Sequence, residues 1–183
     1  MIRLFVGLAL PQDLRNRLAM VSSGLPGARW IDRENLHMTL CFMGQVEDPQ
    51  AEDVDLALSG VRGAAFDFSI SGISTFGRGH QIHTLWAKVE ADPKLMALQA
   101  KIEQAMRNLG LPIEGRKFTP HITLARTKAA QSSKIAQWLQ TGGGLTAGPV
   151  HVDSFVLFRS HLGSGAPHYE VLREYDLEPE QPG

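Results

Sequence analysis

The chain has 183 residues, enough for one domain with a sizeable hydrophobic core. With 43% hydrophobic and 20% charged residues, its composition is that of an ordinary soluble globular protein. The net charge of −1 excludes an overall basic field that would hold a long polyanion, and leaves room for a small anionic ligand or the end of a nucleic acid.

The cellular setting is indicated by what the sequence lacks. Cys41 is the only cysteine, which excludes an internal disulfide and fits a reducing cytosol. The apolar run over residues 1–11 is too short to span a membrane and has no signal-peptide cleavage pattern. We expect a cytoplasmic protein and, without a coiled-coil pattern or a large apolar helix, a monomer.

The first half of the chain predicts alternating strands and helices. An apolar run that stops at Pro11 indicates a buried strand, and leucines at helical spacing follow it. The expected elements are a strand over 3–10, a helix over 12–23, a short strand over 29–31, a strand over 36–43 that Gly44 ends, and a helix over 49–58.

The second half repeats this order. Asp92 and Pro93 begin a well-marked helix with apolar residues at spacings of three and four, which Gly110 ends. The other expected elements are strands over 66–71, 84–89 and 118–125, a helix over 132–139, a closing strand pair over 150–158 and 169–177, and a loose end over 178–183. This pattern predicts one α+β domain over 1–183, with antiparallel pairing in two similar lobes.

One motif, His-x-Thr-Leu, occurs once in each half of the chain. The first copy is His37–Leu40 and the second is His121–Leu124. In an extended strand, residues i and i+2 point to the same face, so each copy presents an imidazole beside a hydroxyl while its apolar residues face a core. Two such strands side by side would form one cleft with two histidines and two threonines.

Two facing imidazoles suit phosphodiester hydrolysis. Histidine titrates near neutral pH, so one ring can take a proton from the attacking water while the other protonates the leaving oxygen. The hydroxyls of Thr39 and Thr123 would donate hydrogen bonds to phosphate oxygens and stabilise developing charge. No zinc-type spacing accompanies either motif, so we expect no metal and no other cofactor.

The residues around both motifs resemble the 2H phosphoesterase superfamily, and more narrowly its LigT-like RNA 2′,3′-cyclic phosphodiesterases (ThpR-type). The resemblance is carried by residues 3–11, by 34–44 around the first motif, by 118–126 around the second, and by 85–87, 155–160 and 169–172. It implies a bilobal 2H phosphoesterase fold, with two pseudo-twofold-related lobes of antiparallel sheet, helices outside and a central cleft.

The resemblance also implies a reaction. A 2′,3′-cyclic phosphate at an RNA or nucleotide end would be opened to a 2′-phosphate, with His37 as proton donor and His121 as proton acceptor. The motif is symmetric, so the residues themselves do not assign these two roles. Three alternatives remain: a phosphodiesterase or ligase for 2′–5′ linkages, an enzyme for small cyclic nucleotides, and a non-catalytic module that binds RNA ends. Binding alone would not need two titratable groups, which argues against the last.

Other residues are weaker candidates. In the family, the arginine that matches Arg126 contributes to the phosphate site, but strict alternation from His121 puts Arg126 on the opposite face unless the strand bulges. Phe5 and Trp30 could stack on a base, with Trp30 preferred, whereas Phe42 has the alternation of a core residue.

Overall fold

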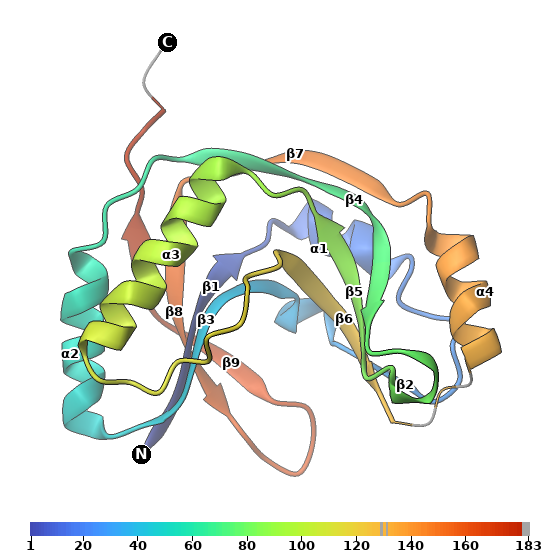
Figure 1. The fold of residues 1–183 in the computed structure, drawn as a ribbon, viewed down its shortest axis with the longest axis horizontal. Coiled ribbons are helices and arrows are strands. Elements are labelled where there is room, and N and C mark those ends of the chain that lie inside the picture. The colour runs from blue at the N-terminus through green and yellow to red at the C-terminus, as the bar shows by residue number, and fades with distance from the viewer. Residues whose placement is uncertain (129, 131, 181–183) are drawn as a thin grey trace.

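Two antiparallel sheets form the framework of the protein (Figure 1). The structure is a computed structural model, and it describes residues 1–128, 130 and 132–180. The first sheet has the strand order β3-β1-β8-β9 and the second the order β2-β6-β5-β4-β7. The strands of the first sheet are β1 (Ile2–Ala9), β3 (His37–Val46), β8 (Ser154–His161) and β9 (His168–Asp176). Those of the second are β2 (Ala28–Trp30), β4 (Phe66–Phe76), β5 (Thr84–Val89), β6 (His121–Thr127) and β7 (Thr146–Val152).

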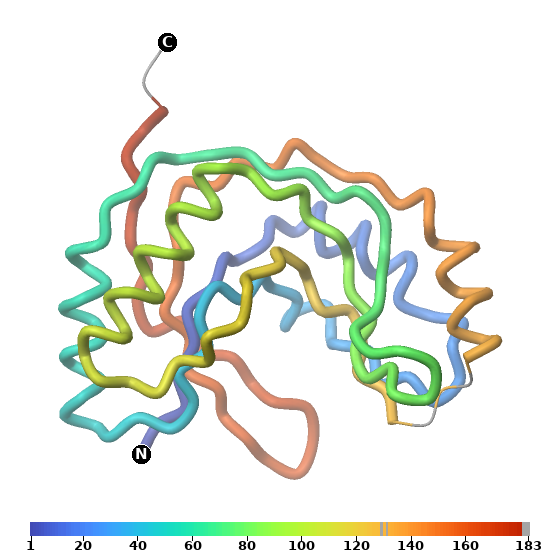
Figure 2. The backbone as a smooth tube through the Cα atoms, viewed as in Figure 1, coloured from blue at the N-terminus to red at the C-terminus, as the bar shows by residue number. Residues whose placement is uncertain are grey.

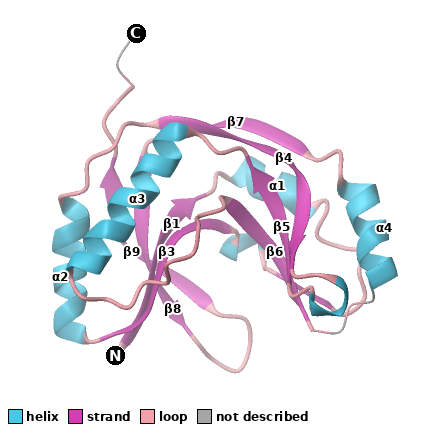
Figure 3. Ribbon diagram, viewed as in Figure 1, coloured by secondary structure: helices cyan, strands magenta, loops and turns pink. Residues whose placement is uncertain are grey.

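The helices lie on the outside of the two sheets (Figure 3). They are α1 (Gln12–Ala19), α2 (Asp48–Ser59), α3 (Pro93–Asn108) and α4 (Ser132–Gly142), and two short 3₁₀ turns cover Arg33–Asn35 and Gly79–Gln81. Helices α2 and α3 lie beside the first sheet, whereas α1 and α4 lie beside the second. These two halves are called here the first lobe and the second lobe. The predicted α+β architecture, with antiparallel sheets and outer helices, is confirmed.

The two lobes are interleaved along the chain. Helix α1 follows β1 of the first sheet but contacts β7 of the second, and α3 follows β5 of the second sheet but contacts β3 of the first. The backbone trace in Figure 2 shows the resulting arch, with the β8–β9 hairpin reaching past its open side. One continuous hydrophobic cluster contains buried residues of both sheets and of all four helices.

Helix α3 shows why the sequence prediction succeeded in local elements. The Asp92 carboxylate accepts hydrogen bonds from the backbone N–H groups of Lys94 and Leu95, at 2.8 and 3.3 Å, and so caps the first turn. The predicted stripe faces the core: Leu95, Leu98 and Ile102 are each at most 1% exposed, and Ala105 and Leu109 are half-buried. Met106, which the prediction left out, is also fully buried. Among the described helices, none has the length and the apolar character that crossing a membrane requires.

The predicted single strand over 150–158 is wrong, because the chain changes sheets within it. Residues up to Val152 pair with β4 in the second sheet, and residues from Ser154 pair with β9 in the first. The Asp153 carbonyl between them accepts a hydrogen bond from the Leu177 N–H at 2.8 Å. Apolar residues continue across this crossing, so the hydrophobic pattern alone does not reveal it.

Gly44 does not end the first motif strand, as the sequence suggested. The strand continues to Val46, and Gly44 adopts a φ of 73°. Along β1, the pairing shifts between Leu4, which faces Gly44, and Phe5, which faces Phe42. Glycine therefore permits a β-bulge at this position, because a positive φ carries no steric cost without a Cβ.

The predicted loose end is described in part. Glu178 forms an isolated bridge with Ala64, and its backbone exchanges hydrogen bonds with Gly63 and Ala65. Residues 181–183 lie outside the described residues.

Candidate active site

The fold brings the two motif strands into contact between the lobes. Strand β3 carries His37–Leu40 and strand β6 carries His121–Leu124, and residues of the two strands contact one another. The alternation predicted from the sequence is confirmed: both histidines and both threonines are half-buried, whereas the apolar motif residues Met38, Leu40, Ile122 and Leu124 are at most 3% exposed.

Both imidazoles are held in the same way. The Nδ1 atom of His37 lies 2.7 Å from the carbonyl oxygen of Asn35, and that of His121 lies 2.7 Å from the carbonyl oxygen of Thr119. A carbonyl oxygen can only accept, so each Nδ1 carries a proton and donates it. In the neutral ring Nε2 is then the acceptor, and Nε2 of His37 lies 2.9 Å from the Thr39 hydroxyl.

The motif side chains line two cavities that adjoin one another. His37, Thr39, Thr123 and Arg126 line a cavity of about 270 Å³. His121 lines a neighbouring cavity of about 620 Å³, to which Thr39 also contributes. The two strands therefore place both imidazoles and both hydroxyls along two cavities that share Thr39 and Phe42 in their linings.

Arg126 reaches the smaller cavity because β6 has a bulge at Leu124, the last residue of its motif. Along β5, Leu85 faces Ala125 while Trp86 faces Thr123, so Leu124 is the extra residue. Leu124 and Ala125 are consequently both fully buried, and Arg126 turns to the face of His121 and Thr123. Strict alternation predicted the opposite face, and the bulge is the physical reason for the difference.

Strand β3 bulges at the matching position and exposes Phe42. Leu40 and Cys41 are both buried, at 3% and 5% exposure, and the ring of Phe42 is 50% exposed and borders both cavities. The core packing that alternation suggested for Phe42 is therefore wrong. The repeated motif includes a repeated bulge, which no spacing in the sequence indicated.

The environment lowers the pKa of both histidines. Burial is the main cause for His37; the bond to Asn35 raises its pKa, and the charges of His121 and Arg126 lower it further. Burial also lowers the pKa of His121, opposed by its bond to Thr119 and reinforced by Arg126.

The first lobe and its hairpin enclose His37. The rings of Phe5, Phe158 and Tyr169 lie 4.8, 5.9 and 5.1 Å from the His37 ring, between centroids. Asn35, which holds Nδ1 of His37, also donates from its side chain to the Pro167 carbonyl of the β8–β9 connection at 2.8 Å. This enclosure removes water from the ring and accounts for the dominant effect of burial on its pKa.

The structure separates the predicted base-stacking residues. Phe5 lines the smaller cavity, but it is only 4% exposed and serves as a wall behind His37. Trp30 lines neither cavity: it pairs with the buried Ala125 across β2 and β6, and its ring lies 5.9 Å from that of Trp138. The structure thus does not bring Trp30 to the histidines.

Sequence reasoning missed Arg3 and Tyr169, which also line the smaller cavity. Arg3 shares a face with Phe5 on β1, so alternation could have placed it. Tyr169 lies on β9, opposite Ser160 of β8 in the first sheet, and it reaches the cavity through the way this sheet meets the second lobe, which the sequence of β9 does not show. Within the described ranges, no three His, Cys, Asp or Glu side chains are grouped so that they could hold a metal ion.

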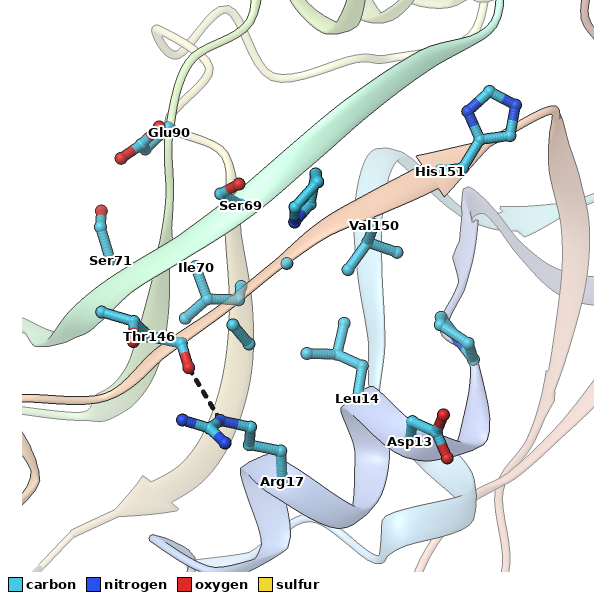
Figure 4. Close-up of a pocket in the computed structure, with 14 residues that line it drawn as sticks. Asp13, Leu14, Arg17, Ser69, Ile70, Ser71, Glu90, Thr146, Val150 and His151 are labelled. Carbon is cyan, nitrogen blue, oxygen red and sulfur yellow. Dashed lines mark hydrogen bonds between the residues drawn. The ribbon is translucent and has the colours of Figure 1, made fainter.

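A cavity of about 900 Å³, larger than these two, lies elsewhere, between α1 and strands β4 and β7 (Figure 4). Its lining includes Asp13, Arg17 and Glu90, and Arg17 is tied to the Thr146 carbonyl at 2.8 Å. Neither motif contributes a residue to it, so size alone would mislead the search for an active site.

Comparison with known proteins identifies the family. The model of the 2′-5′ RNA ligase superfamily matches residues 10–164. The chain belongs to this superfamily. It is 30% identical over 162 residues to an RNA 2′,3′-cyclic phosphodiesterase of Aeropyrum pernix, covering 87% of this chain and 92% of that one. It is 28% identical over 185 residues to the protein of the same name from Thermotoga maritima, covering 97% and 96%.

The fold is shared with E. coli LigT. The crystal structure of LigT complexed with 3′-AMP matches with a TM-score of 0.78 at 24% identity and covers 96% of this chain and 98% of that one. At this identity the match concerns the fold alone. The expected LigT-like, bilobal 2H phosphoesterase fold is confirmed.

Proposed function

We propose that this protein hydrolyses 2′,3′-cyclic phosphates at RNA or nucleotide ends to 2′-phosphomonoesters, with two histidines and no metal. The observation that carries the proposal is the matched pair of imidazoles, each donating Nδ1–H to a backbone carbonyl and each lining the region between the lobes. The expected class of enzyme, an RNA 2′,3′-cyclic phosphodiesterase, agrees with the relatives of that name.

In the proposed reaction a water oxygen attacks phosphorus and His121 accepts the proton that this water loses. The bond between phosphorus and the 3′ oxygen breaks, and His37 donates a proton to that oxygen. The products are a 2′-phosphomonoester and a free 3′-hydroxyl, and solvent exchange returns both rings to their starting states. Each proton transfer supplies about 10²–10⁴-fold in rate. The choice of donor and acceptor follows the family resemblance.

Thr39, Thr123 and Arg126 would bind the scissile phosphate. All three line the smaller cavity with His37. The Thr39 hydroxyl lies 2.9 Å from Nε2 of His37, so in the free protein it donates to the neutral ring. A bound phosphate would instead receive hydrogen bonds from the hydroxyls and from the Arg126 guanidinium, which stabilise charge in the transition state.

Substrate charge would prepare the acid. The lowered pKa of both histidines makes neutral rings the dominant form of the free protein at neutral pH. A phosphate anion beside His37 favours its protonated form and raises its pKa. Substrate binding therefore creates the imidazolium that must protonate the 3′ oxygen.

The test is turnover, in EDTA, of a short RNA that ends in a 2′,3′-cyclic phosphate, with 2′- and 3′-phosphate products resolved. We expect a 2′-phosphate product, formed about 10²–10⁴-fold more slowly by His37→Ala and by His121→Ala. Loss of wild-type turnover in EDTA, or turnover that either substitution leaves unchanged, would contradict the proposal.

A second candidate activity, on 2′–5′ RNA linkages, is favoured by the name of the superfamily. Joining such an end is the formal reverse of phosphodiester cleavage and would use the same two proton transfers. An RNA with an internal 2′–5′ linkage, added as a second substrate in the same assay, distinguishes the two activities.

A further inference from the structure

Arg3 is a cation in the smaller cavity without an acidic partner. It projects from β1 into the cavity that holds His37, Thr39, Thr123 and Arg126. Over the part of the chain that the structure describes, no Asp or Glu lines this cavity, and Arg3 makes no hydrogen bond or ion pair. Its guanidinium carbon lies 4.9 Å from the centre of the half-exposed Phe42 ring.

The cavity thus holds two arginines from opposite lobes. Like charges that share a small space destabilise the empty protein, and anions bound beside the two arginines remove this cost. The Phe42 ring supports the guanidinium of Arg3, because a guanidinium stacks on an aromatic face. This support orients the planar donors of Arg3, and oriented donors suit bidentate binding of a phosphate.

The two arginines occupy different positions relative to the histidines. Arg126 lies on the motif strand β6, and its charge lowers the pKa of both His37 and His121. Both arginines lower the pKa of Tyr169, at the side of the cavity formed by the hairpin. On β1 it is Phe5 whose ring contacts His37. Arg3 precedes Phe5 by two residues, so the two Cα atoms lie about 6.6 Å apart in an extended strand. Arg3 therefore serves an anion other than the one between the imidazoles.

The chemistry of an RNA end identifies that anion. Both ester oxygens of a 2′,3′-cyclic phosphate belong to the terminal ribose, so the only other anionic group on that nucleotide is the phosphate on its 5′ oxygen. We propose that Arg3, stacked on Phe42, binds this 5′ phosphate. The inference rests on the proposed function for the placement of the cyclic phosphate. It makes the protein selective for nucleotides that carry a 5′ phosphate over simple nucleoside 2′,3′-cyclic phosphates.

Two adenosine product analogues test the site without requiring turnover. Adenosine 2′-phosphate lacks the 5′ phosphate and adenosine 2′,5′-bisphosphate carries it. We expect wild type to bind the bisphosphate about 10- to 100-fold more tightly by calorimetry, the range for charge-assisted hydrogen bonds. Arg3→Gln should remove most of this difference and leave the affinity for adenosine 2′-phosphate unchanged. Arg62→Gln, which removes the same charge from an exposed loop position, is the matched control and should change neither.

Turnover separates this inference from the proposed function. Three substrates are compared: adenosine 2′,3′-cyclic phosphate, its 5′-phosphorylated form, and a dinucleotide that ends in the cyclic phosphate. Arg3→Gln should lower kcat/KM about tenfold or more for the last two, mainly through KM, and spare the first. The last two substrates distinguish a 5′ monoester from the diester of an RNA chain. Phe42→Leu should produce a smaller loss on the same two substrates.

Equal binding of the two analogues by wild type would overturn the inference, and so would an Arg3→Gln loss that is the same for all ligands. Absence of any turnover by wild type would instead contradict the proposed function. The binding measurement still decides the role of Arg3 in that case.

Discussion

The two motif strands share their backbone chemistry and differ in what surrounds it. Each histidine donates Nδ1–H to the carbonyl two residues earlier, and each strand bulges at the last residue of its motif. The neighbouring strands are unlike: Gly7 of β1 faces Thr39, whereas Trp86 of β5 faces Thr123. The two lobes therefore share the backbone carbonyl that keeps the proton on Nδ1, and they differ in the side chains packed against each histidine.

This packing gives the histidines different environments. Because Gly7 has no side chain, there is room beside it for the rings of Phe5 and Phe158. These two rings stack with their centroids 4.9 Å apart and enclose His37. On the other side, Trp86 occupies this space itself, and it contacts His121 together with Phe76 at ring distances of 5.6 and 5.0 Å. A symmetric motif can thus supply one proton donor and one proton acceptor, because its surroundings are not symmetric.

The largest expected effects come from removing either imidazole. His37→Ala and His121→Ala should each lower kcat by about 10²–10⁴-fold, since each loses one proton transfer. The pH–rate profile should change from a bell to a single limb: the variant without the base loses the acidic limb, and the variant without the acid loses the alkaline limb. Stopped assays from pH 4 to 9 measure this. If His37→Ala lost the acidic limb instead, the two roles would be exchanged.

The next largest effect should come from Gly7→Ala. A Cβ at this position would lie 2.6 Å from the Met38 carbonyl oxygen, which belongs to backbone and cannot move independently. We expect a loss of stability of about 1–3 kcal/mol and a fall in kcat of about tenfold, as the first motif strand is displaced. Urea unfolding and turnover measure the two effects.

Gly60→Ala is the control, since an added Cβ there meets an atom no closer than 3.5 Å. It should leave kcat unchanged. Equal activity of the two alanine variants would show that the close approach of β1 to β3 is not needed.

A smaller effect should come from opening either aromatic enclosure. Phe158→Leu lets water approach His37 and should raise its pKa, which moves the alkaline limb of kcat/KM to higher pH if His37 is the acid. Phe76→Leu should do the same to His121 and move the acidic limb to higher pH. We expect kcat to change only a few-fold. Movement of the same limb in both variants would be incompatible with separate roles.

The smallest effect concerns the free protein. Both histidines have a pKa below the ordinary value of 6.5, so the unfolded chain binds more protons than the folded one as pH falls below 6.5. The free energy of unfolding should therefore decrease as the pH falls from 6.5 through the pKa values of the two histidines in the folded protein. Above pH 6.5 the contribution of these two histidines should be constant. Imidazole titrations by NMR should place both midpoints below 6.5, and added inorganic phosphate should move them upward. A midpoint above 6.5 without phosphate would contradict this.

The sequence by itself determined the local features of the site. Alternation placed His37 and Thr39 on one face and Met38 and Leu40 on the other, because neighbouring side chains in a strand point to opposite faces whatever the partner strand is. Helix α3 was predicted for a similar reason, since its cap and apolar stripe lie within a few turns. The repeated motif was enough to indicate two imidazoles, and the motif together with the residues around it indicated the family.

Only the tertiary structure decided those features of the site that depend on strands and helices distant in the sequence. The bulges at Leu40 and Leu124 arise from the pairing of β3 with β1 and of β6 with β5, and they turn Phe42 and Arg126 toward the cavities. The change of sheets at Asp153 and the packing of the half-buried Trp30 against Trp138 likewise depend on which strands and helices meet. A bulge shifts register through hydrogen bonds to another strand, and the sequence of one strand does not contain that register.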